Sequence, residues 1–515
     1  MASIKPSVPK GTRDFSPAEM AKRNFIFDTI KSVFRKYGYQ QIETPSMENL
    51  STLTGKYGDE GDKLMFKILE SGEYLNKVDI RKTVSTLIQD VYNNSLDLKE
   101  TQSLLFLERL EALQNTTILS EQDQDTIRSF RNIVAHNLSW GDLNLNSNKL
   151  TPQISEKALR YDLTVPFARY VVQHQNEITF PFKRFQVQPV WRADRPQKGR
   201  YREFFQCDAD VVGSDSLLNE AEFILIYDEA LSALGLKDFT IKINNRKILS
   251  GIAELIDKAD NIIDLTVAID KLDKIGFDGV VKELLERGFT EADIDKIKPV
   301  ILLRGTNDEK LASLRKALST SVIGLKGCEE IETVFNYLQS CKLQTATCEL
   351  DITLARGLNY YTGAIFEVKT NEVAMGSIGG GGRYDDLTGM FGLKDLTGAG
   401  ISFGADRIYD VMEELSLFPA ATNQSTKVLI CCFDKDGEQY ALPLLQQLRA
   451  ENINSELYPA GVKIKKQMDY ANNKQIPYVI LIGSDEMQSG LLSFKNMASG
   501  EQEKLTAAQI ISKLL

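Results

Sequence analysis

Histidine is almost absent from this chain, which has 515 residues but only His136 and His174. A metal site built chiefly from imidazole side chains is therefore excluded. The six cysteines include no pair at Cys-x-x-Cys spacing, which argues against a zinc ribbon and against a disulfide framework. We therefore expect neither zinc nor histidine-based catalysis.

Long hydrophobic runs are also missing. No segment approaches the roughly 18–20 apolar residues that a membrane-spanning helix needs. The first residues, MASIKPSVPKGTRDF, hold no apolar core of the kind found in signal peptides. The sequence thus predicts a cytoplasmic protein with no membrane partner.

The composition is that of a globular protein, with 43% hydrophobic and 26% charged residues, and the length predicts about three domains. A formal net charge of −10, taken alone, argues against a nucleic-acid partner, because phosphates are bound by clustered cations. The charge is unevenly distributed, however, since residues 181–202 carry a net +6. Its cations are Lys183, Arg184, Arg192, Arg195, Lys198, Arg200 and Arg202.

The first predicted element is a helix that begins at Pro17. Ser16 and Glu19 form a capping-box pattern around this position. Gly38 is expected to end the helix, and the residues that follow alternate like a strand as far as Pro45. The apolar stripe of the helix consists of Ile26, Ile30, Val33 and Tyr37.

The rest of the chain changes character several times. Residues 76–150 are rich in Asn, Gln, Ser and Leu and predict a helical insertion with a polar surface, to which the sequence assigns no role. Residues 246–344 are mainly helical, and strand patterns return at 345–417. A short linker at 418–425 precedes residues 426–515, where strands and helices alternate as in a parallel sheet with helical crossovers.

The basic segment 181–202 has the pattern of a strand hairpin. Aromatic and aliphatic residues alternate with its arginines, and RPQKGR interrupts the alternation as a hairpin loop would. Guanidinium groups fixed on a sheet suit bidentate phosphate contacts, so the pattern favours a polyphosphate site over a solvated basic loop. A P-loop is excluded, because no G-x-x-x-x-G-K-[ST] sequence occurs. The glycine-rich stretch 376–387 indicates either backbone packed against a ligand or a structural turn.

Several segments, taken in chain order, resemble the histidyl-tRNA synthetase family of class II aminoacyl-tRNA synthetases. KGTRDFSP with its helix is similar to the first class motif, and RYDLTVPFARYV is similar to the histidine-pocket strand. WRADRPQKGRYREFFQCDADVVG resembles the second class motif, and LARGLNYYTGAIFEV resembles the histidine-specific signature. GGGGRYDDL and GISFGADRI resemble the remaining pocket and the third class motif. Only about 76–150 is not covered.

The resemblance implies a multidomain protein of α/β and α+β class. Residues 1–245 and 345–417 would form the class II catalytic core, an antiparallel sheet. The helical residues 246–344 would lie near the tRNA acceptor stem, and residues 426–515 would form an α/β anticodon-binding domain. A homodimer through the first-motif helix and strand is also implied.

The implied reaction is the ligation of L-histidine to tRNA(His). Histidine and ATP give histidyl-adenylate and pyrophosphate, and histidine is then transferred to the 3′ end of the tRNA. Arg192 matches the second-motif arginine that holds the α-phosphate and the substrate carboxylate, and Arg356 matches the arginine peculiar to the family. Arg407 matches the third-motif arginine at the γ-phosphate, while Arg200 and Phe204 should meet the nucleotide. Mg²⁺ is expected to bridge the phosphates, because it prefers oxygen ligands.

The resemblance also implies a polar histidine site. The Asp162 carboxylate and the Thr164 hydroxyl match the site for the α-amino group, and Tyr384 either closes the imidazole pocket or serves packing alone. By the same resemblance, Arg192 and Arg356 would serve histidine binding as well as catalysis. The full implied set is Asp162, Leu163, Thr164, Arg192, Gln206, Asp210, Arg356, Tyr360, Tyr361 and Tyr384.

Three lysines at the start of a helix in the last segment are candidates for tRNA phosphate contacts, although a solvated helix face explains them equally well. These are Lys463, Lys465 and Lys466.

Two positions depart from the family pattern. Asn359 stands where many relatives have Asp, which removes a charge beside Arg356, and Asp406 stands where Glu is frequent. A second hypothesis is a catalytically inactive, synthetase-like regulatory paralogue that senses histidine or uncharged tRNA. The presence of Arg192, Arg356 and Arg407 argues against it.

Overall fold

A computed structural model describes residues 5–71, 151, 154–355, 360–385, 387–419, 426–459 and 461–515. The predicted insertion at 76–150, Arg356 and Asn359 lie outside the described residues. The chain divides into two compact units. One comprises Met1–Thr12 with Thr29–Val411, and the other comprises Arg13–Asp28 with Met412–Leu515.

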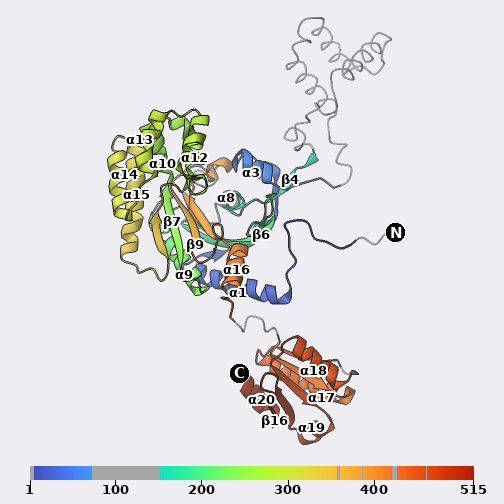
Figure 1. The fold of residues 1–515 in the computed structure, drawn as a ribbon. Helices are drawn as coiled ribbons and strands as arrows, with labels where there is room; N and C mark the ends of the chain where they lie inside the picture. The colour runs from blue at the N-terminus through green and yellow to red at the C-terminus, as the bar shows by residue number, and fades with distance from the viewer. Residues whose placement is uncertain are drawn as a thin grey trace, which may run out of the picture. The chain divides into compact units, whose positions relative to one another are not determined.

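The larger unit is built on an eight-stranded sheet of order β1-β5-β6-β11-β10-β9-β7-β8 (Figure 1). The two outermost pairs, β1 with β5 and β7 with β8, are parallel, and the pairs between them are antiparallel. The predicted antiparallel core is therefore confirmed. The strands span Gln40–Gln41 (β1), Phe182–Trp191 (β5), Glu203–Val212 (β6), Phe239–Asn245 (β7), Thr347–Leu350 (β8), Ala364–Thr370 (β9), Gly379–Arg383 (β10) and Gly398–Gly404 (β11).

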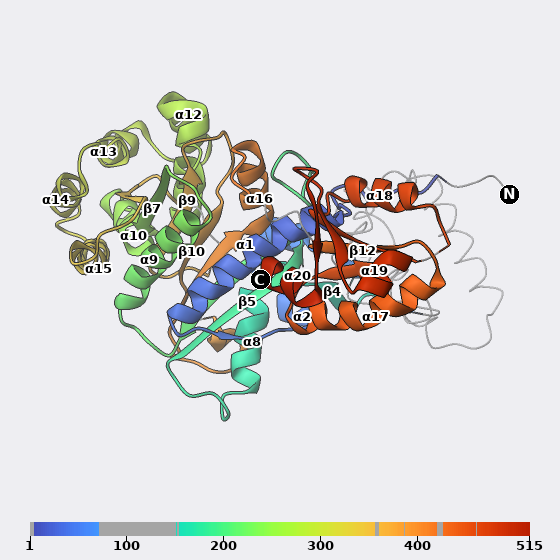
Figure 2. The same ribbon diagram turned by 90° about the horizontal axis from the view of Figure 1, so that it is seen from below.

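Two helices cover one face of this sheet, namely the second half of α1 (Pro17–Lys36) and α9 (Leu218–Ala233), which lie side by side (Figure 2). The Phe34 ring of α1 lies 5.5 Å from the ring of Phe185 and 5.8 Å from the ring of Phe403. The Tyr227 ring of α9 lies 4.7 Å from the Phe403 ring. Because side chains alternate along a strand, the residues between these apolar positions point to the opposite face, which we call the pocket face.

Helix α1 begins as predicted. The Ser16 amide donates to Glu19 Oε2 at 2.6 Å, and the Glu19 amide donates to Ser16 Oγ at 3.3 Å. Gly38 adopts a φ of +80°, which suits a helix C-terminus. The predicted strand is much shorter than expected, because the Gln188 side chain, rather than a strand, hydrogen-bonds the backbone N–H and C=O of Thr44.

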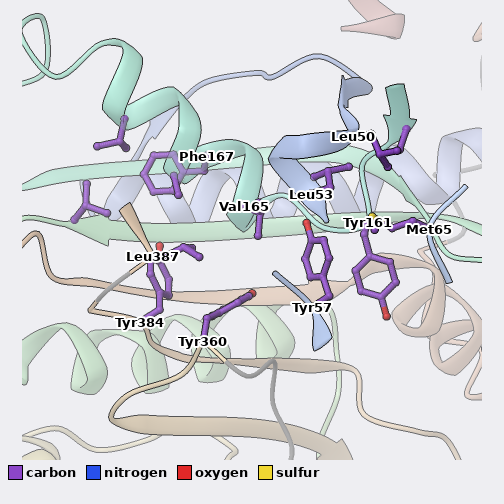
Figure 3. Packing of buried hydrophobic residues seen from close by; sticks show 14 residues of the cluster. Leu50, Leu53, Tyr57, Met65, Tyr161, Val165, Phe167, Tyr360, Tyr384 and Leu387 are labelled. Atoms are coloured by element: carbon purple, nitrogen blue, oxygen red, sulfur yellow. The ribbon is translucent and has the colours of Figure 1, made fainter. Parts of the chain in front are cut away.

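The pocket face carries a smaller sheet and a helix. The sheet has the order β2-β4-β3, formed by Met47–Asn49, Lys157–Leu159 and Lys67–Ile68. Helix α8 (Thr164–Gln173) packs with α2 (Leu50–Leu53) and the aromatic residues around α3 (Gly58–Leu64) in one apolar cluster (Figure 3).

Residues 246–344 form helices, as predicted, and these gather beside β7 (Figure 1). Thr290 and Thr306 each begin a helix with a capping box that the sequence analysis did not use. The helices are α10 (Arg246–Leu255), η2 (Ala259–Asn261), α11 (Ile262–Ile269), α12 (Leu272–Glu286), α13 (Glu291–Ile301), α14 (Asn307–Ala317) and α15 (Val322–Gln339).

The second unit holds a five-stranded sheet of order β13-β12-β14-β15-β16. The central β12 pairs in parallel with β13 and β14, as predicted, whereas β15 and β16 add an antiparallel hairpin that was not predicted. The strands span Val428–Cys432 (β12), Ser455–Leu457 (β13), Tyr478–Ile482 (β14), Leu492–Asn496 (β15) and Gln502–Leu505 (β16).

Helices cover both faces of this second sheet. Alternate residues of β12 pack against α17 (Lys435–Ala450) and α20 (Ala507–Leu514), and the others pack against α18 (Ile464–Asn473). The short α19 (Ser484–Ser489) follows β14. In the part of the chain that the structure describes, no helix combines the length and the apolar character needed to cross a membrane.

The close approach of β10 to β11 gives a stability prediction. A Cβ atom at Gly381 would lie 2.2 Å from the Gly400 carbonyl oxygen and 2.7 Å from Ile401 Cα. Because these are backbone atoms that cannot swing aside, Gly381→Ala should lower the free energy of unfolding by about 2–3 kcal/mol. Gly389→Ala is the control, since a Cβ atom there would lie 3.9 Å from its nearest neighbour, Lys394 Cγ. Equal urea-unfolding midpoints for the two variants would contradict the prediction.

Candidate active site

A cavity of about 380 Å³ opens on the pocket face of the large sheet. Its lining comes from β6, β9, β10 and β11, from the hairpin loop between β5 and β6, and from the residues around α8 and α16 (Ala405–Glu414). The sequence-predicted residues in this lining are Asp162, Thr164, Arg192, Arg200, Phe204, Gln206, Tyr360, Tyr361 and Arg407.

The other predicted residues lie elsewhere. Leu163, Asp210 and Tyr384 are buried behind the lining. The three lysines are in the second unit, exposed at the start of α18.

Asp162 stands just before α8 and is held by three donors. Its Oδ1 accepts from the Tyr57 hydroxyl at 2.8 Å and from the Val165 amide at 3.2 Å, and its Oδ2 accepts from the Tyr360 hydroxyl at 3.2 Å. Burial raises the pKa of the Asp162 carboxyl, while these hydrogen bonds favour its ionised form. Tyr57 and Tyr360 lie beside one another below Val165 (Figure 3). The sequence analysis missed Tyr57, because no local pattern marks a residue whose partner, Asp162, is 105 residues away along the chain.

The deepest part of the site contains an ion pair. Arg184 is fully buried, and its Nη2 lies 2.7 Å from Asp210 Oδ2. The Tyr384 hydroxyl donates to Asp210 Oδ1 at 2.5 Å. Tyr384 therefore does more than pack, since it holds a carboxylate in place. Burial raises the pKa of the Asp210 carboxyl, and the positive charge of Arg184 opposes part of this rise.

Asp208 lies on β6 between Gln206 and Asp210, and the sequence analysis did not name it. It lines the cavity, it is 2% exposed, and Oδ1 has no hydrogen-bond partner among the described residues. Burial raises the pKa of its carboxyl to about 7. The signal was in the sequence, because side chains alternate along a strand and Gln206, Asp208 and Asp210 therefore share one face.

The cavity's cations are held mainly by backbone carbonyls and aromatic rings. Arg192 Nε donates to the Tyr161 carbonyl at 3.1 Å, and its guanidinium lies 4.4 Å from the Tyr161 ring and 5.2 Å from the Phe204 ring. Arg407 donates to the carbonyls of Gly199 and Ser377, at 2.6 Å each. These contacts fix two guanidinium groups at the cavity.

The predicted hairpin is confirmed, but its seven cations do not form one cluster. Only Arg192 and Arg200 line the cavity. Lys183 forms an ion pair with Glu222, and Arg184 lies under the floor. Arg200 is itself paired with Asp194, at 3.0 Å. A net charge of +6 in the sequence therefore overstates the charge that the cavity receives.

Asp406, one of the two departures from the family pattern, has a structural role. Its Oδ2 accepts the Phe205 amide of β6 at 2.7 Å. A shorter acid thus fits at the start of α16, next to Arg407.

The structure also decides between the two interpretations of the glycine-rich stretch. Gly379–Arg383 is a central strand, so the interpretation as a turn is wrong there.

The site as a whole has two electrostatic halves. In one half, three carboxylates are buried, namely Asp162, Asp208 and Asp210, and the fully buried Arg184 lies beside Asp208 and is paired with Asp210. The guanidinium groups of Arg192 and Arg407 belong to the other half. Such a cavity suits a ligand pair in which one partner carries amino groups and the other carries phosphates.

Comparison with known proteins identifies the family. A family model described as histidyl-tRNA synthetase matches residues 11–109 and 137–408, and one described as anticodon binding domain matches residues 427–515. The chain belongs to the histidyl-tRNA synthetase family. The class II fold and the C-terminal anticodon-binding domain that the resemblance implied are thereby confirmed.

Individual relatives extend over the full chain. The histidine–tRNA ligase of Cytophaga hutchinsonii is 53% identical over 511 residues, covering 99% of this chain and 100% of the relative. That of Bacteroides fragilis (strain YCH46) is 53% identical over 512 residues and 99% of each chain. The segment 76–150 is therefore shared with relatives, and the regulatory paralogue is not favoured.

Solved structures share the fold. A histidyl-tRNA synthetase from Nostoc superposes with a TM-score of 0.73 at 27% identity, covering 100% of both chains. A Bacillus halodurans protein titled ATP phosphoribosyltransferase regulatory subunit/histidyl-tRNA synthetase superposes with a TM-score of 0.64 at 18% identity, over 93% of this chain and 99% of that chain. At that identity the second likeness concerns the fold alone.

The raised pKa of Asp208 makes its ionised form costly for the free enzyme. Folding shifts this pKa from 3.8 to about 7. The resulting loss of folding free energy therefore begins near pH 4 and is complete above pH 7. By linkage it amounts to about 4 kcal/mol at pH 8. Asp208→Asn should therefore unfold at higher urea than the wild type at pH 8, with a smaller gain at pH 5. Asp278→Asn, on an exposed part of α12, is the control. A variant less stable than the wild type at pH 8 would contradict this prediction.

Proposed function

We propose that this chain is a histidine–tRNA ligase that uses ATP to activate L-histidine and then transfers it to the 3′ end of tRNA(His). The observation that carries the proposal is the two-sided cavity, in which buried carboxylates stand beside guanidinium groups. Histidine offers an ammonium and an imidazole to the first half, and ATP offers phosphates to the second. Full-length relatives named histidine–tRNA ligase support the same substrates.

The cationic half would act in the first step. The histidine carboxylate attacks the α-phosphate, and pyrophosphate leaves. Because the attacking group is already an anion, the step needs no general base from the protein. Arg192, with Arg356, would stabilise the charge that develops on the α-phosphate oxygens. Arg407 would bind the γ-phosphate, and Arg200 and Phe204 would contact the rest of the nucleotide.

The anionic half would hold histidine. Asp162, Thr164 and Gln206 would receive its ammonium group, with Leu163 as the packed residue behind them. Asp210 would add negative charge from behind the lining of the cavity. Its Oδ1 accepts a hydrogen bond from the Tyr384 hydroxyl. The rings of Tyr360 and Tyr361, whose centroids lie 5.0 Å apart, would enclose the imidazole.

ATP would enter as its Mg²⁺ complex. Mg²⁺ needs oxygen ligands and usually takes one or two carboxylates besides the phosphates. Glu367 fits this need, because it lines the cavity and is hydrogen-bonded to Ser377, whose carbonyl also holds Arg407. When bound, the ion would neutralise phosphate charge during displacement.

The remaining roles are proposed from the family. Residues 1–245 and 345–417 would be the catalytic core, 246–344 would approach the acceptor stem, 418–425 would link, and 426–515 would read the anticodon. A homodimer would form through the first-motif helix and strand, and the enzyme would act in the cytoplasm. Segment 76–150 has no role that we propose.

Loss of the family-specific arginine tests the first step. Arg356→Ala should lower histidine-dependent ATP–pyrophosphate exchange by about 10³-fold, because transition-state charge on the phosphate loses a preorganised cation. The control is Arg315→Ala, which removes only an exposed pair with Glu332. Circular dichroism should show both variants folded. Near-normal exchange in Arg356→Ala would remove that residue from the mechanism.

The lysines of α18 give a separate prediction for tRNA. If Lys463, Lys465 and Lys466 contact phosphates, replacing all three by Ala should weaken tRNA(His) binding and reduce the slope of log affinity against log salt by about 2–3. Exchange without tRNA should not change. Wild-type affinity with an unchanged salt slope would identify the lysines as an ordinary solvated helix face.

A further inference from the structure

Tyr57 is a buried tyrosine beside the cavity to which the proposed mechanism gives no role. It immediately precedes α3 and is 5% exposed. Its hydroxyl donates to Asp162 Oδ1 at 2.8 Å. The other two donors to this carboxylate, the Val165 amide and the Tyr360 hydroxyl, each lie at 3.2 Å. Tyr57 therefore makes the closest of the three hydrogen bonds to the group that is proposed to receive the ammonium of histidine.

The hydroxyl of Tyr57 affects the charge of Asp162. Burial raises the pKa of the Asp162 carboxyl, and the hydrogen bond from Tyr57 is the strongest of the interactions that oppose this rise. Only the ionised carboxylate attracts an ammonium group, so this hydrogen bond favours the form that can bind histidine. Burial and the negative charge of Asp162 also raise the pKa of Tyr57 well above its ordinary value, so the phenol remains a donor.

The ring of Tyr57 contacts the support of a second group in the site. Its centroid lies 4.7 Å from that of the Tyr161 ring, and the two rings are side by side in Figure 3. The Arg192 guanidinium lies 4.4 Å from the same Tyr161 ring, and Arg192 Nε donates to the Tyr161 carbonyl. Tyr161 thus connects Tyr57 with the arginine that is proposed to hold the histidine carboxylate.

The main chain on either side of Tyr57 is fixed to its surroundings. Before Tyr57, the Gly55 amide donates to Asp62 Oδ2 at 2.8 Å. At the end of α3, the Leu64 carbonyl accepts the amide of Ala193, the residue that follows Arg192, at 2.8 Å. These two hydrogen bonds hold the segment against the hairpin, so the hydroxyl and the ring of Tyr57 have defined positions.

We infer that Tyr57 is a positioning residue for the amino-acid substrate, whose hydroxyl holds the Asp162 carboxylate for the ammonium group and whose ring supports Arg192 through Tyr161. The inference rests on the proposed function and adds to it a residue that lies in none of the motifs that carry the family resemblance. The hydroxyl should affect binding of the ammonium group, and the ring should affect the reacting carboxylate.

Two substitutions separate these contacts in histidine-dependent ATP–pyrophosphate exchange. Tyr57→Phe removes only the hydroxyl and should raise the KM for histidine about 10-fold, because a hydrogen bond to a charged group is lost. Its kcat and KM for ATP should stay within about twofold of wild type. Tyr57→Leu also removes the ring and should lower kcat about 10-fold, because Arg192 loses part of its support. The control is Tyr470→Phe, since the Tyr470 hydroxyl makes a bond of the same length, 2.8 Å, to Glu456 in the second unit.

Two competitive inhibitors distinguish positioning at the ammonium group from a general loss of structure. Histamine carries the ammonium and the imidazole without the carboxylate, and imidazolepropionate carries the imidazole and the carboxylate without the ammonium. In Tyr57→Phe, the inhibition constant of histamine should rise by about the same factor as the KM for histidine. The inhibition constant of imidazolepropionate should stay within about twofold of wild type.

Unchanged binding of histidine and histamine by Tyr57→Phe would overturn the inference. Equal weakening of histamine and imidazolepropionate would overturn it as well, because the role of the hydroxyl would then be structural. A kcat of Tyr57→Leu equal to that of Tyr57→Phe would refute the role of the ring, and Tyr57→Met takes its place if Tyr57→Leu does not fold. Absence of histidine-dependent exchange in the wild type would instead refute the proposed function, and histamine binding by calorimetry would still test Tyr57.

Discussion

The pairing of Arg184 with Asp210 on the pocket face of the large sheet is the interaction on which the rest of the site depends. Both groups are removed from water, which is tolerable only when charge is balanced and hydrogen bonds are made. The balance is incomplete, because Asp162 and Asp208 are buried nearby and their pKa values are raised by the same burial. The wall therefore holds an excess of negative potential, which a cationic or N–H-rich ligand relieves.

The sheet makes this wall possible by separating two kinds of side chain. Along β6, Cys207, Ala209 and Val211 pack toward the helices, while Asp208 and Asp210 between them are on the pocket face. Across from the acids, β11 supplies Gly400, where a Cβ atom would lie 2.0 Å from Asp210 Oδ1. Stability is thus supplied by one face of the strand and chemistry by the other. A single-residue register shift would exchange them.

Prediction from sequence succeeded where the signal was local. The capping box at Ser16 and the hairpin around RPQKGR have fixed spacings, and both are present in the structure. It failed where partners are distant: Tyr57 reaches Asp162 across 105 residues, and the side chain of Gln188 replaces the strand expected before Pro45.

The candidate site shows both behaviours. Most of the predicted residues meet in one cavity, because β6, the hairpin loop that precedes it, the residues before β9 and the starts of α8 and α16 all border it. Asp208 was overlooked although period-two alternation placed it between Gln206 and Asp210. The structural role of Asp406 could be recognised only from the hydrogen bond that its Oδ2 accepts from the Phe205 amide.

The most direct test of the account is the charging of purified tRNA(His) with radiolabelled histidine in the presence of ATP and Mg²⁺. A histidine–tRNA ligase should attach label to the 3′ end of this tRNA and should leave other tRNAs uncharged. More enzyme should raise the rate of charging but not the final amount of charged tRNA. Histidine binding without any charging would contradict the account, because a cavity that binds the amino acid but transfers nothing belongs to a sensor rather than to a ligase.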